Sequence, residues 1–362
     1  MKNKIKKIIN GMKERMILTS VLFGALVLAL LLGGYAFRGV LFPKSEVPDQ
    51  PSSEQNEPTE QWRHPLTGLP TMEREDLPQV YAVMIDHSAD AWPQAGINQA
   101  FLVIEAPVEA GIPRLEAFFY QGQEVDKIGP VRSARPYFVD WANELDAMYV
   151  HVGGSNQALE LIDNNGTFDL NQFWNGQSFW RDNDTRYAPH NVYTSTELLG
   201  KALEKTQAEE RNQELVYGVW EFADESEDIS NWETADPIIQ FTSGSTYTAK
   251  WVFDAEAQKY QRWQGNYAFQ TETDEDIWAN NIAVMITDVE VIDGVGRKEI
   301  RTTGRGDAYV FRDGKVIEGK WVKPSASQRL RFITLDGQEI KLNPGTTWIE
   351  VIDGYDKLEF SK

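Results

Sequence analysis

The stretch "KIGPVRSARPYFVDWANELDAMYVHVGGS", residues 127–155, decides the expected fold. Apolar residues recur at helical spacing after Pro136, and a helix tolerates proline only in its first turn. A helix is therefore predicted to begin near Ser133 or Ala134, with Ser133 as its cap. The glycine pair and Ser155 that close the stretch lead into a second predicted helix.

Four short apolar runs in and around this stretch predict strands. They are VYAVMID, AFLVIEA, RLEAFFYQ and MYVHV, at residues 80–86, 100–106, 114–121 and 148–152. Because these strands alternate with predicted helices, residues 62–208 are expected to form an α/β N-terminal globular domain.

The composition and periodicity of the sequence change towards its C-terminal third. Residues 209–237 are acidic and weakly periodic, which indicates a connector. In residues 238–362, short strand patterns are separated by turn signals, of which Asp313-Gly314 and Asp336-Gly337 predict tight hairpins. This segment is expected to be a mostly antiparallel β C-terminal domain, either a sandwich or a small barrel.

Residues 16–37 form an uncharged stretch of 22 residues. At about 1.5 Å per residue, a helix of this length spans roughly 33 Å, close to the thickness of a bilayer core. The six lysines and arginines in residues 1–15 predict a basic cytoplasmic tail. We therefore predict one transmembrane helix, a disordered linker at residues 38–61, and extracytoplasmic globular domains on a single-pass protein of the cell membrane. A cleavable signal peptide and a buried core helix are the alternatives.

The formal net charge of −20 and the lack of cysteine limit the possible functions. An acidic body repels polyanions, so no nucleic-acid partner is expected. Without cysteine there are no disulfides, zinc–thiolate sites or lipidated cysteine. No set of His, Asp and Glu has metal-ligand spacing, so neither a metal nor a cofactor is expected. An anionic ligand would have to be held locally, by a few arginines or by helix N-termini.

Arg132 and Arg135 are predicted to lie around the first turn of a helix. The unpaired N–H groups of a helix N-terminus favour anions, and the arginine fork suits phosphate or carboxylate oxygens. The junction at Gly153–Ser155 repeats the order of strand, glycine and helix start, so both junctions are expected to face one crevice of the sheet. The alternative is that the two arginines form ion pairs with nearby glutamates, namely Glu105, Glu109 or Glu116.

Other polar residues stand where predicted strands or loops end. Asp86, at a strand end, and His190, on a loop where it could act as a general base, are the candidate catalytic residues. His87 is interpreted as a solvated turn residue, and His151 either as a ligand-binding residue or as a satisfied core histidine. The predicted ligand-binding residues are Arg114, Arg132, Ser133, Arg135, His151, Gly153, Gly154, Ser155, Asn156, Arg186, His190 and Asn191.

Several motifs together resemble the YerB-like lipoprotein family, which consists of exported proteins of Gram-positive bacteria. They include "HPLTGLP" (64–70), "AVMIDH" (82–87), "KIGPVRSARPYFVD", "YVHVGGS" and "YAPHNVY" (187–193). The resemblance implies an extracytoplasmic location and a domain of unknown function followed by a separate C-terminal domain. It implies no particular activity. Family members typically carry a lipobox cysteine, and because this chain has none, the predicted transmembrane helix is expected to replace the lipid.

The expected function is that of a membrane-anchored protein of the cell envelope that binds an anionic ligand through its α/β domain. The ligand would carry phosphate or carboxylate and be lipid-linked or part of the cell wall. One alternative is an envelope enzyme acting on such phosphates, a phosphotransferase or hydrolase. The expected order of elements is similar to that of the LytR-CpsA-Psr phosphotransferases, although no signature is shared. In that case Asp86 would hold a metal or water. The other alternative is a non-catalytic scaffold for another envelope protein.

Overall fold

The computed structural model describes residues 62–209, 215–224 and 234–360. The predicted basic tail, transmembrane helix and linker, at residues 1–15, 16–37 and 38–61, lie outside the described residues. Within the described ranges, no helix is both long enough and apolar enough to cross a membrane. The fold below is that of the unit Glu60–Lys362.

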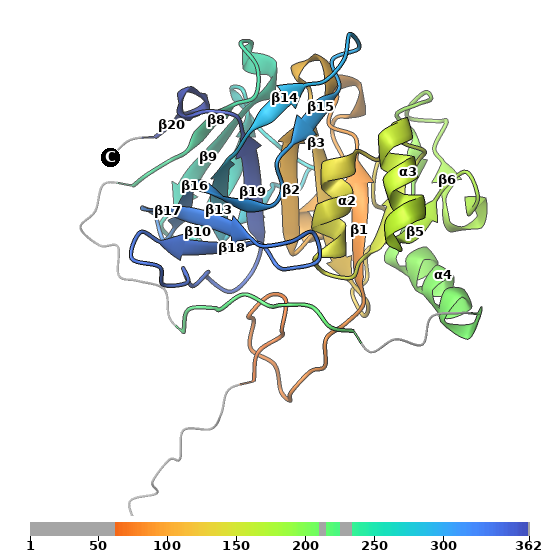
Figure 1. Ribbon diagram of the computed structural model, residues 1–362, viewed down its shortest axis with the longest axis horizontal. Helices are drawn as coiled ribbons and strands as arrows, with labels where there is room; N and C mark the ends of the chain where they lie inside the picture. Colours follow the sequence, from red (N-terminus) through yellow and green to blue (C-terminus); the bar gives the residue numbers. More distant parts are fainter. Residues whose placement is uncertain (1–61, 210–214, 225–233, 361–362) are drawn as a thin grey trace, which may run out of the picture. The chain divides into compact units, whose positions relative to one another are not determined.

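A ten-stranded mixed sheet forms the centre of this unit (Figure 1). From one edge to the other, its strands are β18 (Arg331–Thr334), β17 (Lys315–Lys323), β16 (Gly304–Arg312), β13 (Asn281–Ile286), β19 (Thr347–Ile352), β2 (Leu102–Pro107), β3 (Pro113–Tyr120), β1 (Val80–Ile85), β4 (Met148–His151) and β5 (Phe168–Asn171). Strands lie at all four of the N-terminal positions that the apolar runs predict. Strands β1, β4 and β5 are parallel neighbours, and so are β13, β19 and β2.

Strand β19 joins the two halves of the sequence in this one sheet. Its Trp348 lies opposite Ile282 of β13 on one side and Val103 of β2 on the other. All six residues of β19 are buried, as expected for a parallel strand covered on both faces. The C-terminal segment is mostly β, as predicted. Its strands β13 and β16 to β19 do not form a sandwich or barrel of their own, because they continue the sheet of the N-terminal segment.

The remaining strands form a six-stranded sheet and two short ribbons. The six-stranded sheet contains β11 (Tyr267–Ala268), β10 (Lys259–Gln264), β9 (Thr248–Asp254), β8 (Ile238–Gln240) and β20 (Leu358–Glu359), with β12 (Trp278–Ala279) paired to β10. The ribbons are β14 (Val289–Val291) with β15 (Lys298–Ile300), and β6 (Trp180–Arg181) with β7 (Val192–Tyr193). The hairpin predicted at Asp313-Gly314 connects β16 to β17, and both turn residues have positive φ, 53° and 71°.

The central sheet is covered on both faces, which gives a three-layer unit. Helices α2 (Pro136–Asn143) and α3 (Asn156–Asn165) pack beside each other on one face (Figure 1). The six-stranded sheet and α4 (Thr196–Glu209) cover the other face. Alternate residues of a strand point to opposite faces. Met84 of β1 accordingly packs with the α2–α3 layer, and Val83 with the second sheet.

Candidate functional site

The segment 131–134 lies across the ends of β1 and β4 and organises the site. Arg132 donates its backbone N–H to the Met84 carbonyl at 2.8 Å and accepts from the Val152 N–H at 3.0 Å. The Ala134 N–H donates to the Gly153 carbonyl at 2.9 Å. The two predicted junctions are therefore adjacent in space. Because these bonds hold the segment extended, α2 begins only at Pro136, later than predicted.

Asp86 lies at the end of β1 and contacts three other side chains. Its Oδ2 is 2.7 Å from His190 Nδ1 and 3.2 Å from Arg132 Nε. Its Oδ1 accepts from the N–H and the hydroxyl of Ser88, both at 3.0 Å. We call Asp86, Ser88, Arg132 and His190 the Asp86 site. The Asp86 side chain is 3% exposed, whereas those of His190 and Arg132 are 20% and 27% exposed.

The Asp86 carboxylate is ionised in this environment. Burial raises the pKa of Asp86, but the Ser88 N–H, the guanidinium groups of Arg132 and Arg114, and the hydrogen bond to His190 lower it more, so the pKa lies below the ordinary value. The negative charge of Asp86 orients the guanidinium group of Arg132 and the ring of His190.

His190 is held through only one of its ring nitrogens. Its Nδ1 faces Asp86 and also lies 3.2 Å from the Ser88 hydroxyl. In a Ser-His-Asp triad the serine and the aspartate face different ring nitrogens, so Ser88 does not complete a triad here. Among the described residues, Nε2 has no hydrogen-bond partner. When Nδ1 carries the ring proton and donates a hydrogen bond to Asp86, Nε2 is left unprotonated and can accept a proton or contact a ligand.

The two arginines of the predicted niche differ in their surroundings. Arg135 donates from Nε and Nη2 to the two carboxylate oxygens of Glu109, both at 2.8 Å. The ion-pair alternative therefore describes Arg135. Arg132 approaches Asp86 only through Nε, and within the described part of the chain its two terminal nitrogens make no hydrogen bond. Arg132 is thus the arginine that is available to a ligand.

Arg114 and Ser133 support the segment that carries Arg132. Arg114 is 7% exposed and donates from Nη1 to the Ser133 carbonyl at 3.0 Å and to its hydroxyl at 3.3 Å. The Ser133 hydroxyl also accepts from Arg135 at 3.2 Å, and it does not cap α2, whose N-cap is Arg135. Burial lowers the pKa of Arg114 to about 10. Both residues hold the segment in place, and their contact with a ligand stays a prediction.

The glycine junction after β4 is shaped by close packing. Gly153 has φ +57°, and a Cβ there would lie 2.8 Å from the Phe173 ring. A Cβ on Gly154 would lie 3.1 Å from that of Ala134. Ser155 caps α3 by accepting from the Ala158 N–H at 3.2 Å. Glycine at both positions leaves room for the neighbouring Phe173 and Ala134. The packing of the protein itself therefore accounts for these two glycines.

The remaining predicted residues are satisfied by protein groups or lie at a helix start. His151 is fully buried, with Nδ1 2.7 Å from the Gly153 carbonyl and Nε2 2.6 Å from Asp169. This matches its interpretation as a satisfied core histidine. Asn191 is also buried, bonded to Arg181 and Asn183 at 2.8 Å each. Arg186 donates to the Tyr193 hydroxyl and the Pro93 carbonyl, and Asn156 is the exposed first residue of α3.

His87 is not the solvated turn residue that the sequence predicts. It is 1% exposed, its Nδ1 contacts Gln94 at 2.8 Å, and its Nε2 is 3.5 Å from Glu105. Burial lowers the pKa of His87 to about 4. The prediction fails because the ring of His87 packs against Trp92 and against Tyr247 and Phe269, which adjoin strands of the second sheet, and no local pattern reveals these contacts.

Ser88 was missed by the sequence reasoning. Its signal is its position two residues after a strand-end aspartate, where a serine N–H commonly bonds back to the carboxylate. The described residues contain no group of three or more His, Asp and Glu side chains placed to hold a metal ion.

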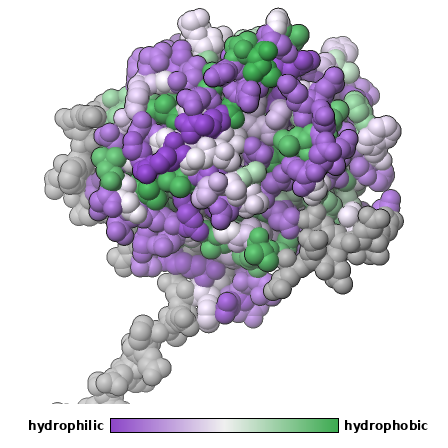
Figure 2. Space-filling model, viewed as in Figure 1, coloured by the Kyte–Doolittle hydropathy of each residue, from purple (hydrophilic) through white to green (hydrophobic). Residues whose placement is uncertain are grey.

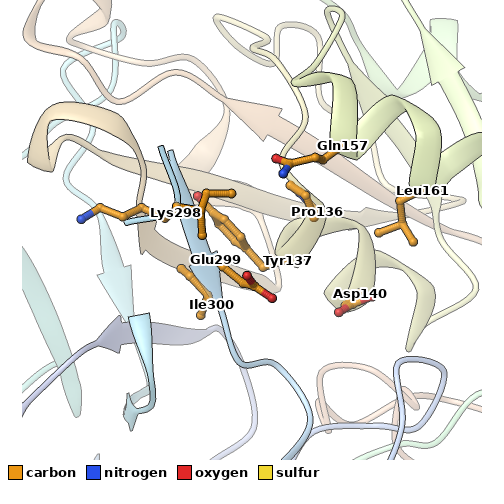
Figure 3. A pocket seen from close by; sticks show the side chains of 9 residues that line it. Pro136, Tyr137, Asp140, Gln157, Leu161, Lys298, Glu299 and Ile300 are labelled. Atoms are coloured by element: carbon orange, nitrogen blue, oxygen red, sulfur yellow. The ribbon is translucent and has the colours of Figure 1, made fainter. Parts of the chain in front are cut away.

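A hollow of about 320 Å³ lies between the two helices and the β14–β15 ribbon. Figure 3 shows Pro136, Tyr137 and Asp140 on the helix side and Glu299 and Ile300 on the ribbon side. Hydrophilic residues cover most of the visible surface, with a hydrophobic group near the tip of this ribbon, where apolar side chains are exposed (Figure 2). The exposed apolar residues there are Val291, Ile292 and Val295. None of the predicted site residues lines this hollow.

The chain matches a family described as "Protein of unknown function (DUF3048)", with the N-terminal domain over residues 66–209 and the C-terminal domain over residues 237–349. The chain belongs to this family, which confirms the resemblance inferred from the motifs. It is 31% identical over 301 residues to a protein of Bacillus subtilis (strain 168) named "Putative lipoprotein YerB", covering 82% of this chain and 88% of that protein. The crystal structure of the YerB protein from Bacillus subtilis is similar, with a TM-score of 0.73 and 30% identity over 83% of this chain and 99% of that chain.

Proposed function

We propose that this protein is a membrane-anchored component of the cell envelope whose Asp86 site binds an anionic group, a phosphate or a carboxylate. The anchoring is supported by the apolar stretch at residues 16–37 with its basic flank, and by the name of the Bacillus subtilis relative as a lipoprotein. The chemistry is shared by lipid-linked phosphates and by charged polymers of the cell wall.

One observation carries the binding proposal. A single oxygen of Asp86 contacts both His190 Nδ1 and Arg132 Nε, at 2.7 and 3.2 Å. Asp86 therefore fixes the orientation of both groups while using only one nitrogen of each. His190 Nε2 and the two terminal nitrogens of Arg132 are left for a ligand, and a guanidinium presents them in the fork geometry that suits phosphate and carboxylate.

The local charge also favours an anion. Three guanidinium groups, those of Arg114, Arg132 and Arg135, lie around the segment 132–135, against the carboxylates of Asp86 and Glu109. This leaves a local excess of positive charge on a chain whose net charge is −20. An anion that is repelled by most of the surface is then attracted at this place.

The test is a titration of the full-length chain, in a detergent free of phosphate and sugar, with inorganic pyrophosphate. Isothermal titration calorimetry should show saturable binding, and Arg132→Gln should weaken it at least tenfold, as expected for the loss of a charge-assisted contact of about 1.5–3 kcal/mol. The matched control is Arg305→Gln, which removes an exposed arginine of β16 and the same charge. No saturable binding to the wild-type protein, or equal loss in both variants, contradicts the proposal.

A second candidate is an envelope enzyme in which His190 acts as a general base. The specific support is the Asp86–His190 hydrogen bond, which fixes the ring so that Nε2 is the proton acceptor. Because Ser88 shares Nδ1 with Asp86, the attacking group would be a water or a substrate hydroxyl. Turnover of a lipid-linked phosphate that falls far more in His190→Asn than the affinity for pyrophosphate falls supports this role. Absence of both turnover and binding leaves the scaffold function.

A further inference from the structure

Two large aromatic side chains are exposed in the turn that follows β5. Phe173 is 63% and Trp174 is 81% exposed. The turn is held by Asn171, whose side-chain Oδ1 accepts from the Phe173 N–H at 3.2 Å and from the Gly153 N–H at 3.1 Å. The Asn171 carbonyl accepts from the Trp174 N–H at 3.1 Å. A well-bonded turn thus holds two adjacent apolar rings in water, and such exposed apolar groups commonly mark interaction sites.

These rings lie next to the Asp86 site along the same edge of the sheet. Strands β1, β4 and β5 are parallel neighbours, so Asp86, Gly153 and Asn171 all stand at carboxyl ends on one edge. The Phe173 ring packs directly over Gly153, whose carbonyl bonds to the segment carrying Arg132. With about 4.8 Å between neighbouring strands, β1 and β5 are roughly 10 Å apart. One ligand can therefore contact both the Asp86 site and the aromatic pair.

The side chains around the rings carry amide groups. Gln172 and Asn175 are partly exposed and Gln177 is exposed, so amide side chains flank the two adjacent aromatic residues. A sugar ring offers C–H groups on its faces and hydroxyls around its rim. Aromatic rings pack against the former, and amides both donate to and accept from the latter.

We propose that the ligand of the Asp86 site is an anionic saccharide. Its phosphate or carboxylate is held by Arg132 and His190, and its sugar ring packs on Phe173 and Trp174. This inference rests on the proposed function, because it adds a saccharide subsite to the anion site. It also assigns to the exposed aromatic pair a role in affinity that is separate from charge.

The test compares four probes on the full-length chain in the same detergent: inorganic phosphate, glucose 1-phosphate, glucose and adenosine monophosphate. Glucose 1-phosphate is expected to bind at least tenfold more tightly than phosphate. Trp174→Ala and Phe173→Ala should each reduce this advantage at least threefold, while phosphate binding stays unchanged. Tyr267→Ala is the matched control, because Tyr267 is 80% exposed on the six-stranded sheet. Both aromatic side chains are exposed, so these variants are expected to fold.

The outcomes separate the two proposals. Equal affinity for phosphate and glucose 1-phosphate, or no effect of the two aromatic variants, overturns the saccharide subsite and leaves the anion site standing. Tighter binding of adenosine monophosphate than of glucose 1-phosphate also overturns the saccharide assignment, since a base would then occupy the rings. If glucose binds and is lost only in the aromatic variants while neither phosphate compound binds more tightly, the subsite is supported and the anion site fails. If no probe binds, both proposals fail.

Discussion

Arg262 of β10 donates from Nη1 to Glu350 of β19 across 2.7 Å, with both side chains fully buried. The same guanidinium reaches Glu105 of β2 from Nη2 at 2.9 Å. Because β10 belongs to the second sheet and β2 and β19 to the central one, this group ties the two sheets together. Trp251 adds a hydrogen bond to Glu350 at 2.8 Å.

We expect Arg262→Met to lower the free energy of unfolding by about 3–5 kcal/mol, because it leaves two buried glutamate side chains without the guanidinium group that they share. Urea unfolding followed by far-UV circular dichroism measures this change. Arg305→Met, at an exposed position, is the control and should change the free energy by less than about 0.5 kcal/mol. A loss at Arg262 no larger than that of the control would show that the buried guanidinium does not hold the sheets together.

Glu350→Gln is expected to be much milder, at less than about 1.5 kcal/mol. Burial and the neighbouring Glu105 raise the pKa of Glu350 well above its ordinary value although Arg262 lowers it, so the fold favours the protonated form of this carboxyl group. Glutamine keeps the oxygen that accepts from Arg262 and Trp251 and offers an N–H toward Glu105. The same urea experiment checks this, and a loss as large as that of Arg262→Met would contradict a protonated Glu350.

Asp86→Asn should reduce stability in a manner that depends on pH. Folding lowers the pKa of Asp86 below its ordinary value of 3.8, so this group stabilises the fold above pH 3.8 and loses the contribution as the pH falls through the folded value. We expect a loss of about 1–3 kcal/mol at pH 7. The difference from wild type should shrink below pH 3.8. Thermal unfolding at pH 7 and at pH 3 tests this, and a difference that grows in acid would contradict it.

Arg135→Gln and Arg132→Gln should separate in their effects on ligand binding. Arg135 is held at two points by Glu109, whereas the terminal nitrogens of Arg132 are unused among the described residues. We expect Arg135→Gln to change pyrophosphate affinity by less than about threefold and to lower stability by about 1–3 kcal/mol. Arg132→Gln should show the opposite pattern in calorimetry and urea unfolding. Equal effects on affinity would mean that both arginines reach the ligand.

Gly153→Ala should destabilise the fold by about 1–3 kcal/mol for two reasons. The residue has φ +57°, and the new Cβ would lie 2.8 Å from the Phe173 ring. Adding Phe173→Ala removes the collision but leaves the backbone cost, so the double variant should lose less than the sum of the two single variants. A double-mutant cycle by urea unfolding measures this coupling, and simple additivity would show that the ring yields without cost.

Local sequence patterns were sufficient to predict the positions of the N-terminal strands but not which strands pair in the sheet. The four N-terminal strands could be predicted because each is a short apolar run between turn signals. The pairing of β2 with β19 could not, because their residues are far apart in the sequence and periodicity carries no information on parallel neighbours. For the same reason the second sheet, which buries His87, could not be placed.

The sequence predicted that Arg132 and Arg135 lie in one niche, but in the structure their side chains contact different carboxylates. In the extended segment 132–135, residues three positions apart point to opposite sides. Arg132 therefore reaches Asp86 and Arg135 reaches Glu109. Had the helix begun near Ser133 or Ala134, as predicted, the two arginines would both have stood around its first turn. The backbone bonds to Met84 and Gly153 decide the outcome, and they come from distant strands.

Because β19 pairs in parallel with both β2 and β13, the N-terminal and C-terminal segments of the family share one sheet, and neither segment is expected to fold without the other. Cutting the chain between them would leave an open apolar strand edge on each fragment, the kind of surface that promotes self-association. Recombinant work on either segment alone would thus be expected to yield aggregates. In evolution, an exchange of one segment between relatives would have to preserve the β2–β19 pairing with the other segment.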